Sequence, residues 1–207
     1  MSYVRWMRQG LFWFLSLSVA LASVRFPLLP QEIGLEHMWH QFVRSPLLLY
    51  VHILISPLAL ALVPVQFSSR LRQSRPRLHR WLGRTYGVAI LLGGVSGLMI
   101  APNAGGGVVG QTGFFLLAVL WLATTTIGIW QARQRNFLSH RKWMIRSAAL
   151  TWAAVTLRLY LPVLTGTLGF DTGYMVVAWM CWVPNLLVAE WLLRRVGPRP
   201  QALPSGA

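Results

Sequence analysis

Six apolar stretches constrain the fold of this chain more than any other feature of its sequence. A helix needs about 20 largely apolar residues to cross the hydrocarbon core of a bilayer. Charged residues make up 11% of the 207 residues, whereas soluble domains carry about 25%. We therefore predict an all-α integral membrane bundle of six transmembrane helices. The stretches span residues 4–29, 47–67, 81–100, 112–131, 144–165 and 172–193.

The stretches leave no room for a separate soluble domain, so we predict one transmembrane domain over residues 1–196. Residues 197–207 are rich in Pro, Gly and Ala, and we expect a disordered tail there. The N-terminus has two interpretations. Arg5, Arg8 and the apolar residues after them resemble a cleavable signal peptide, but we favour an uncleaved anchor helix.

Arginine dominates the charge of the chain and predicts its orientation. The formal net charge is +15, which in a soluble protein would indicate nucleic-acid binding. Here the arginines lie between the apolar stretches, so we expect a lipid bilayer as partner and no nucleic acid. Lys and Arg concentrate on the cytoplasmic side of membranes; residues 70–84 and 133–146 carry most of them, and the loop 101–111 carries none. This predicts cytoplasmic N- and C-termini in a multi-pass membrane protein.

Three histidines fall on predicted helix faces that are lined with small or polar residues. Residues spaced at i, i+4, i+7 and i+11 share one face of a helix. His52, His79 and His140 each begin such a face, on three different helices. The face that begins at His140 reaches Arg158, about five turns further on. Polar side chains at membrane depth are functional candidates by default.

His79 and His140 have the positions expected of the two axial ligands of a b-type haem. Both fall in the first turns of helices that start at the cytoplasmic side, so their depths match, and glycines beside His79 would leave room for a flat ring. Axial ligands and their surroundings set the potential of such a haem. The alternative is that these histidines bind lipid phosphate or cap a neighbouring helix. The arginines that would pair with haem propionates are Arg80, Arg84, Arg141 and Arg146.

The outer loop contains a candidate metal site. His37 and His40 are spaced to share a helical face and lie beside Glu36. Two or three imidazoles with a carboxylate suit zinc or copper. The alternative is an amphipathic segment that lies on the membrane with Trp39 as its anchor.

Arg158 predicts a polar pocket in the outer half of the bundle. It lies at a height similar to that of His52, and a buried guanidinium is costly unless it is paired. We predict an outer polar pocket of His52, Arg158 and Glu36, with Glu32 and Asp171 as further partners. The pocket is either a structural ion pair or a site for an anionic or carbonyl-bearing ligand, such as a quinone head group.

Glu190 is the only acidic residue inside a predicted helix, near the cytoplasmic end of the sixth stretch. Its expected role is charge pairing. The candidate partners are Arg80, Arg84 and Arg146.

Three motifs resemble those of a known family. The motifs are Leu78-His79-Arg80-Trp81-Leu82-Gly83-Arg84, His140-Arg141-Lys142-Trp143-Met144-Ile145-Arg146 and Leu157-Arg158-Leu159-Tyr160-Leu161-Pro162. In their order and spacing they are similar to a family of bacterial predicted membrane proteins, domain of unknown function 2306, over roughly residues 48–195. The resemblance implies six or seven helices, a location in the bacterial cytoplasmic (inner) membrane and no established activity.

A more distant likeness is to b561-type cytochromes, six-helix proteins that carry electrons across membranes. One core helix of those proteins opens with a Leu-His-x-Trp-x-Gly pattern, which residues 78–83 of this chain match. The resemblance implies that His79 pairs with a histidine two helices later, where His140 lies. Their second histidine pair is incomplete in this chain, so the resemblance implies one haem at most.

Three functions stay open at the level of the sequence. The first is a redox protein with one b-type haem near the cytoplasmic side that serves a quinone. The second is a non-catalytic accessory subunit of a larger membrane complex. The third is a small transporter or sensor, for which helices broken at mid-membrane would be the sign; Pro57, Pro64 and Pro184 are expected kinks. The matched positions of His79 and His140 favour the redox protein.

Overall fold

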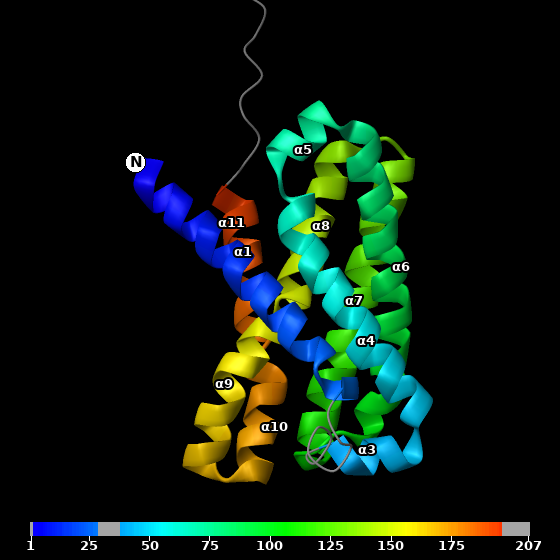
Figure 1. Ribbon diagram of the computed structural model, residues 1–207, viewed down its shortest axis with the longest axis vertical. Helices are drawn as coiled ribbons and strands as arrows, with labels where there is room; N and C mark the ends of the chain where they lie inside the picture. The colour runs from blue at the N-terminus through cyan, green and yellow to red at the C-terminus, as the bar shows by residue number, and fades with distance from the viewer. Residues whose placement is uncertain (1, 29–37, 196–207) are drawn as a thin grey trace, which may run out of the picture.

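Helices make up the fold that is shown in Figure 1. The computed structural model describes residues 2–28 and 38–195. Within these residues, six helical segments are long and apolar enough to cross a membrane. They are Trp6–Val24, Pro46–Gln66, Pro76–Asn103, Gly107–Arg133, Phe137–Leu168 and Phe170–Arg195. The prediction of an all-α bundle with six membrane-spanning segments is confirmed.

Four segments are built on one long helix each, and the other two are each divided into a pair of helices. The undivided helices are α1 (Ser2–Val24), α4 (Pro46–Gln66), α6 (Pro76–Ile100, followed by the 3-10 turn η3, Ala101–Asn103) and α7 (Gly107–Arg133). The divided segments are α8 (Phe137–Thr151) with α9 (Ala153–Leu168), and α10 (Phe170–Met180) with α11 (Val183–Arg195). Short elements in the connections are η1 (Phe26–Leu28), α3 (Trp39–Arg44) and α5 (Ser69–Ser74).

The two ends of the bundle differ in charge. In Figure 1, α5, the start of α1 and the end of α11 lie at one end, together with the connection between α7 and α8. We call it the arginine-rich end, because it contains most of residues 70–84 and 133–146. α3, η3 and the turn between α9 and α10 lie at the opposite end, which we call the glycine-loop end after residues 105–107.

Glycines let α6 approach α4 closely. A Cβ placed on Gly93 would lie 2.5 Å from Ser56 Oγ, and one on Gly97 would lie 2.9 Å from His52 Cε1. Small residues at helix interfaces allow this kind of close packing in membranes. Buried apolar residues complete the contact: Ala59, Leu62, Val63, Ala89 and Ile90.

Pro184 explains the break in the sixth segment. α10 ends at Met180, and Pro184 is the second residue of α11. Proline lacks an N–H, and its ring clashes with the carbonyl four residues earlier, which here belongs to Met180. The break at residues 181–182 therefore agrees with the kink predicted at Pro184. α4, in contrast, stays helical through Pro57 and Pro64.

The break in the fifth segment contains no proline and is held by α1. It falls at Trp152, between α8 and α9. Trp152 Nε1 donates to Ser16 Oγ at 2.8 Å, and the indole stacks on Phe12 with 5.4 Å between ring centroids. Ser16 is fully buried. The sequence predicted one continuous helix here, because the anchoring contact comes from a distant part of the chain.

Candidate haem site and polar interior

α6 and α8 face each other across the interior, and Tyr86 spans the distance between them. Its hydroxyl lies 2.9 Å from both Ser147 Oγ and Thr151 Oγ1 of α8. Tyr86 follows His79 by seven residues, and Ser147 follows His140 by seven. Seven residues are about two helical turns, so the two histidines lie at one level on α6 and α8, two turns nearer the arginine-rich end than this contact. Their rings lie close enough to interact electrostatically.

The ring of His140 is oriented by α7. Its Nδ1 atom lies 2.7 Å from the carbonyl oxygen of Gly128. A neutral imidazole that donates from Nδ1 presents the lone pair of Nε2, and histidines that bind metals are commonly held in this way. Asn136 caps α8 by accepting from Ser139 N at 3.1 Å, which places His140 in the first turn.

His79 is half-buried in the first turn of α6, which begins at Pro76. Its backbone carbonyl accepts from Gln66 Nε2 at 3.3 Å, so the end of α4 holds this turn. Its Nδ1 atom is buried and has no hydrogen-bond partner among the residues that the structure describes. A buried polar atom of this kind requires an explanation, such as a bound ion or ligand.

Neighbouring side chains occupy the space beside the glycines that follow His79. A Cβ on Gly83 would lie 3.6 Å from Gln66 Oε1, and one on Gly87 would lie 2.8 Å from Ile129 Cδ1. The expectation that these glycines leave room for a flat ring stays a prediction. They serve the approach of α4 and α7 to α6. Room between the two histidines depends instead on the separation of α6 and α8.

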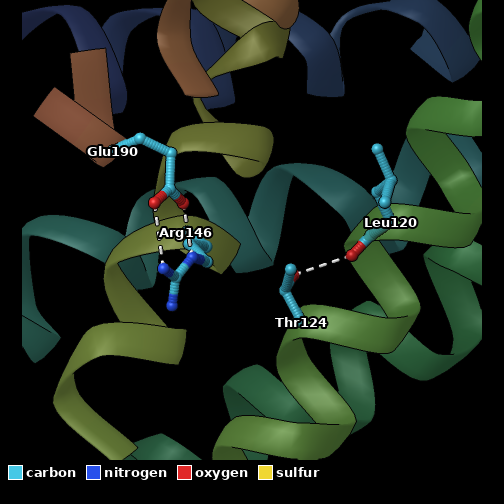
Figure 2. Close-up of polar contacts among 4 residues, drawn as sticks. All are labelled: Leu120, Thr124, Arg146 and Glu190. Atoms are coloured by element: carbon cyan, nitrogen blue, oxygen red, sulfur yellow. Dashed lines mark hydrogen bonds and ion pairs between the residues drawn. The ribbon is translucent and has the colours of Figure 1, made fainter. Parts of the chain in front are cut away.

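Arg146 is already paired within the protein. Its Nε atom lies 2.5 Å from Glu190 Oε1 and its Nη2 atom 3.0 Å from Oε2, as Figure 2 shows. Its guanidinium carbon also lies 4.7 Å from the ring centroid of Trp143. The predicted pairing of Glu190 with an arginine is confirmed, and the partner is Arg146. The other three arginines proposed for haem propionates are exposed: Arg80, Arg84 and Arg141.

A buried polar network joins α6, α7 and α8. Trp121 Nε1 donates to Thr151 Oγ1 at 2.8 Å, and Thr125 Oγ1 lies 2.7 Å from Ser147 Oγ. The Tyr86 hydroxyl completes the network through its contacts with Ser147 and Thr151. All five side chains are buried, so these hydroxyls and the indole N–H satisfy one another without water.

Three members of this network were not predicted from the sequence: Tyr86, Trp121 and Thr125. Tyr86 carried a usable signal, because it shares a helix face with His79. The signal for Thr125 in the sequence was weak, because it lies in a run of three threonines. Its neighbour Thr124 donates instead to the carbonyl of Leu120 in its own helix, at 2.8 Å (Figure 2), and periodicity alone does not separate the two.

Asn185 satisfies carbonyls at both helix breaks. Its Nδ2 atom lies 3.3 Å from the carbonyl oxygen of Ala149 and 3.0 Å from that of Cys181. Thr156 Oγ1 donates to the same Cys181 carbonyl and lies 3.1 Å from Asn185 Nδ2. In transporters with broken helices, freed backbone groups bind substrate or ions. Here side chains of the protein occupy these carbonyls.

The outer-pocket residues His52 and Arg158 make separate contacts. His52 Nδ1 lies 2.8 Å from the carbonyl oxygen of Gly93 on α6. Arg158 donates from Nη1 to the Ala154 carbonyl at 3.0 Å and from Nη2 to Ser23 Oγ at 2.7 Å. The His52 and Arg158 side chains nevertheless lie near enough to interact electrostatically.

The predicted acidic partners of Arg158 divide into two groups. Asp171 is exposed in the first turn of α10. Within residues 2–28 and 38–195 the one ion pair joins Arg146 and Glu190, so Asp171 forms no ion pair with Arg158. Glu32 and Glu36 lie outside the described residues. These two acids therefore stay predicted partners.

The predicted metal site also falls largely outside the described part of the chain. His37 is not described, and His40 is described only as part of the backbone of α3. The described residues contain no group of three or more His, Cys, Asp or Glu side chains that could hold a metal ion. Metal binding at His37 and His40 stays a prediction.

Six apolar helical segments around a hydrogen-bonded polar interior define a multi-pass integral membrane protein. The model of a family described as "Predicted membrane protein (DUF2306)" matches residues 49–193. The chain belongs to this family, which confirms the predicted resemblance to it. No curated protein and no solved structure matches the chain.

Proposed function

We propose that the protein is a membrane redox protein that binds one b-type haem between His79 and His140 and exchanges electrons with a membrane quinone. The observation that carries the proposal is the contact of Tyr86 with α8, which puts His79 and His140 at one level on α6 and α8. Two imidazoles at one depth on facing helices are the ligand set of such a haem. The likeness of the start of α6 to b561-type cytochromes supports the same pair.

The two histidines would hold the iron in different ways. The carbonyl of Gly128 engages Nδ1 of His140, which leaves Nε2 for the metal. His79 has no such constraint on its Nδ1 atom among the described residues, so its ring is free to turn towards the iron. Arginines bind carboxylates such as haem propionates, and since Arg146 is held by Glu190, that role falls to Arg80, Arg84 and Arg141.

A quinone is the electron partner that suits this position. It dissolves in the bilayer and reaches a haem that lies within the helices close to the head groups. The haem supplies one-electron chemistry. A quinone can gain or lose its electrons one at a time, so it would suit a partner that exchanges single electrons.

The optical spectrum of the purified protein from haem-replete cells tests the proposal. We expect the reduced protein to show the split visible band of a low-spin haem with two histidine ligands. His79→Ala and His140→Ala should each abolish the band. His52→Ala is the matched control and should keep it, because His52 bonds to Gly93 away from this pair. A colourless wild-type protein, or a band that survives both substitutions, would refute haem binding.

Helix α1 favours a second candidate, a non-catalytic accessory subunit of a larger membrane complex. The apolar window of α1 is 17% buried, the lowest value among the six segments. Trp6, Leu11 and Phe14 are 74%, 58% and 65% exposed. A surface of this kind suits lipid or another membrane protein. A colourless protein that co-migrates with a partner in mild detergent would favour this second function.

A further inference from the structure

We infer that Arg158 and Arg25, together with Ser23, form a binding site for an oxyanion head group carried by an apolar molecule, as in an anionic phospholipid. The site lies where α9 meets the end of α1. It does not depend on the proposed haem, whose histidines belong to α6 and α8 at the arginine-rich end.

Arg158 reaches from α9 to α1 and is only partly used there. Its described acceptors are Ser23 Oγ at 2.7 Å and the Ala154 carbonyl at 3.0 Å. Ser23 donates its own hydroxyl hydrogen to the Val19 carbonyl at 2.7 Å, so its oxygen is the acceptor for Arg158. A guanidinium carries more N–H donors than these two acceptors occupy. Its remaining donors have no acceptor among the described residues.

The groups around Arg158 are basic. Arg25, which follows α1, and His52 of α4 both lie near enough to interact with it electrostatically. In the described part of the chain, no carboxylate forms an ion pair with Arg158. Like charges near each other repel, and the half-buried guanidinium of Arg158 is costly at membrane depth unless it is paired. An oxyanion bound between Arg25 and Arg158 would remove this cost.

The surroundings suit a ligand with an apolar body. Leu159 and Val163 of α9 are 52% and 63% exposed, and the Arg25 guanidinium carbon lies 5.6 Å from the centroid of the Phe26 ring. Leu159 and Val163 belong to the apolar surface that α9 exposes, and the apolar body of a molecule held at Arg158 would lie against such a surface. A phospholipid has both parts, whereas inorganic phosphate has only the oxyanion.

Thermal unfolding of the purified full-length protein in neutral detergent tests this site. Phosphatidylglycerol should raise the Tm, because a ligand that binds only the folded state stabilises it by mass action. Phosphatidylcholine and inorganic phosphate should raise it less. Arg158→Ala and Arg25→Gln should each lose most of the shift caused by phosphatidylglycerol. Arg133→Ala, which removes an exposed charge at the other end, should keep it.

Arg25→Gln keeps the test decisive if Arg158→Ala fails to fold, because the Arg25 side chain is exposed. Retention of the full shift in the folded variants would overturn the site. Equal stabilisation by inorganic phosphate would overturn the assignment to a lipid. If a Glu32→Gln, Glu36→Gln double variant lowers the Tm as Arg158→Ala does, the anion is part of the chain and the inference fails.

Discussion

At the scale of single residues, Tyr86 both packs in the interior and takes part in its hydrogen bonds. Its ring fills the distance between α6 and α8, and its hydroxyl contacts two hydroxyl groups of α8. The bilayer core supplies no water to polar groups, so each of these hydroxyls needs a partner from the protein. Trp121 and Thr125 of α7 provide the remaining partners.

Replacing Tyr86 by Phe should lower the free energy of unfolding by about 1 kcal/mol, because two bonds are lost and hydrogen bonds between membrane helices contribute about 0.6 kcal/mol each. The ring stays, so packing is kept. Thermal unfolding followed by tryptophan fluorescence measures the change. Tyr160→Phe is the matched control, since Tyr160 is exposed on α9. Equal stability of the two variants would mean that the Tyr86 hydroxyl contributes no net stability.

At the scale of elements, the two helix breaks lie against each other and share one side chain. Asn185 of α11 contacts the Ala149 carbonyl of α8 and the Cys181 carbonyl at the second break. Figure 1 shows the α9–α10 pair to the side of α4 and α6, with α1 crossing at the level of the first break. The breaks thus change the direction of two segments while their backbone groups stay satisfied.

Asn185→Leu should destabilise the protein by about 2 kcal/mol, because it keeps the size of the side chain and leaves the Ala149 carbonyl without this donor; a buried polar group left unsatisfied costs about 1–3 kcal/mol. The Cys181 carbonyl keeps Thr156 Oγ1 as its donor. Hydrogen exchange should rise at the amides around Trp152 and Cys181 and stay unchanged in α4 and α6. Gln134→Leu, at an exposed position between α7 and α8, controls for the change of polarity. Unchanged exchange at both breaks would show that Asn185 does not hold them.

At the scale of the whole molecule, successive segments cross the membrane in opposite directions, so each connection lies at one of the two ends of the bundle. The positive-inside rule predicts that the arginine-rich end faces the cytoplasm. The glycine-loop end then faces outward, with residues 105–107 and the turn between α9 and α10.

Cysteine labelling in intact cells tests this orientation. A membrane-impermeant maleimide should react with Val108→Cys, whose side chain is 77% exposed at the start of α7, and should react with Gln73→Cys of α5 only after the membrane is opened. Native Cys181 is buried and gives a low background. Val108 is preferred to Gly106, where a Cβ would lie 2.7 Å from Met175 N. Labelling of Gln73→Cys alone in intact cells would reverse the topology.

Single positions illustrate how far the sequence could predict the candidate site. It placed His79 and His140 at one depth, because both begin helices on the same side. It limited the partner of Glu190 to three arginines, and only the structure selected Arg146. The fifth segment begins at Phe137, before the predicted residue 144. A helix can begin among the charged lipid head groups, so its first residues are helical although they are not apolar.

The sequence by itself determined the number of membrane-spanning segments, their order and the charge of each end, because bilayer thickness sets a minimum apolar length and lipid excludes charge. Only the tertiary structure decided where two helices break, which residues form the polar network and what Arg158 contacts. These features depend on which helix faces meet. Ser16 contacts Trp152 and Tyr86 contacts Ser147 across long stretches of chain, and helical periodicity indicates that a face is buried without indicating which helix covers it.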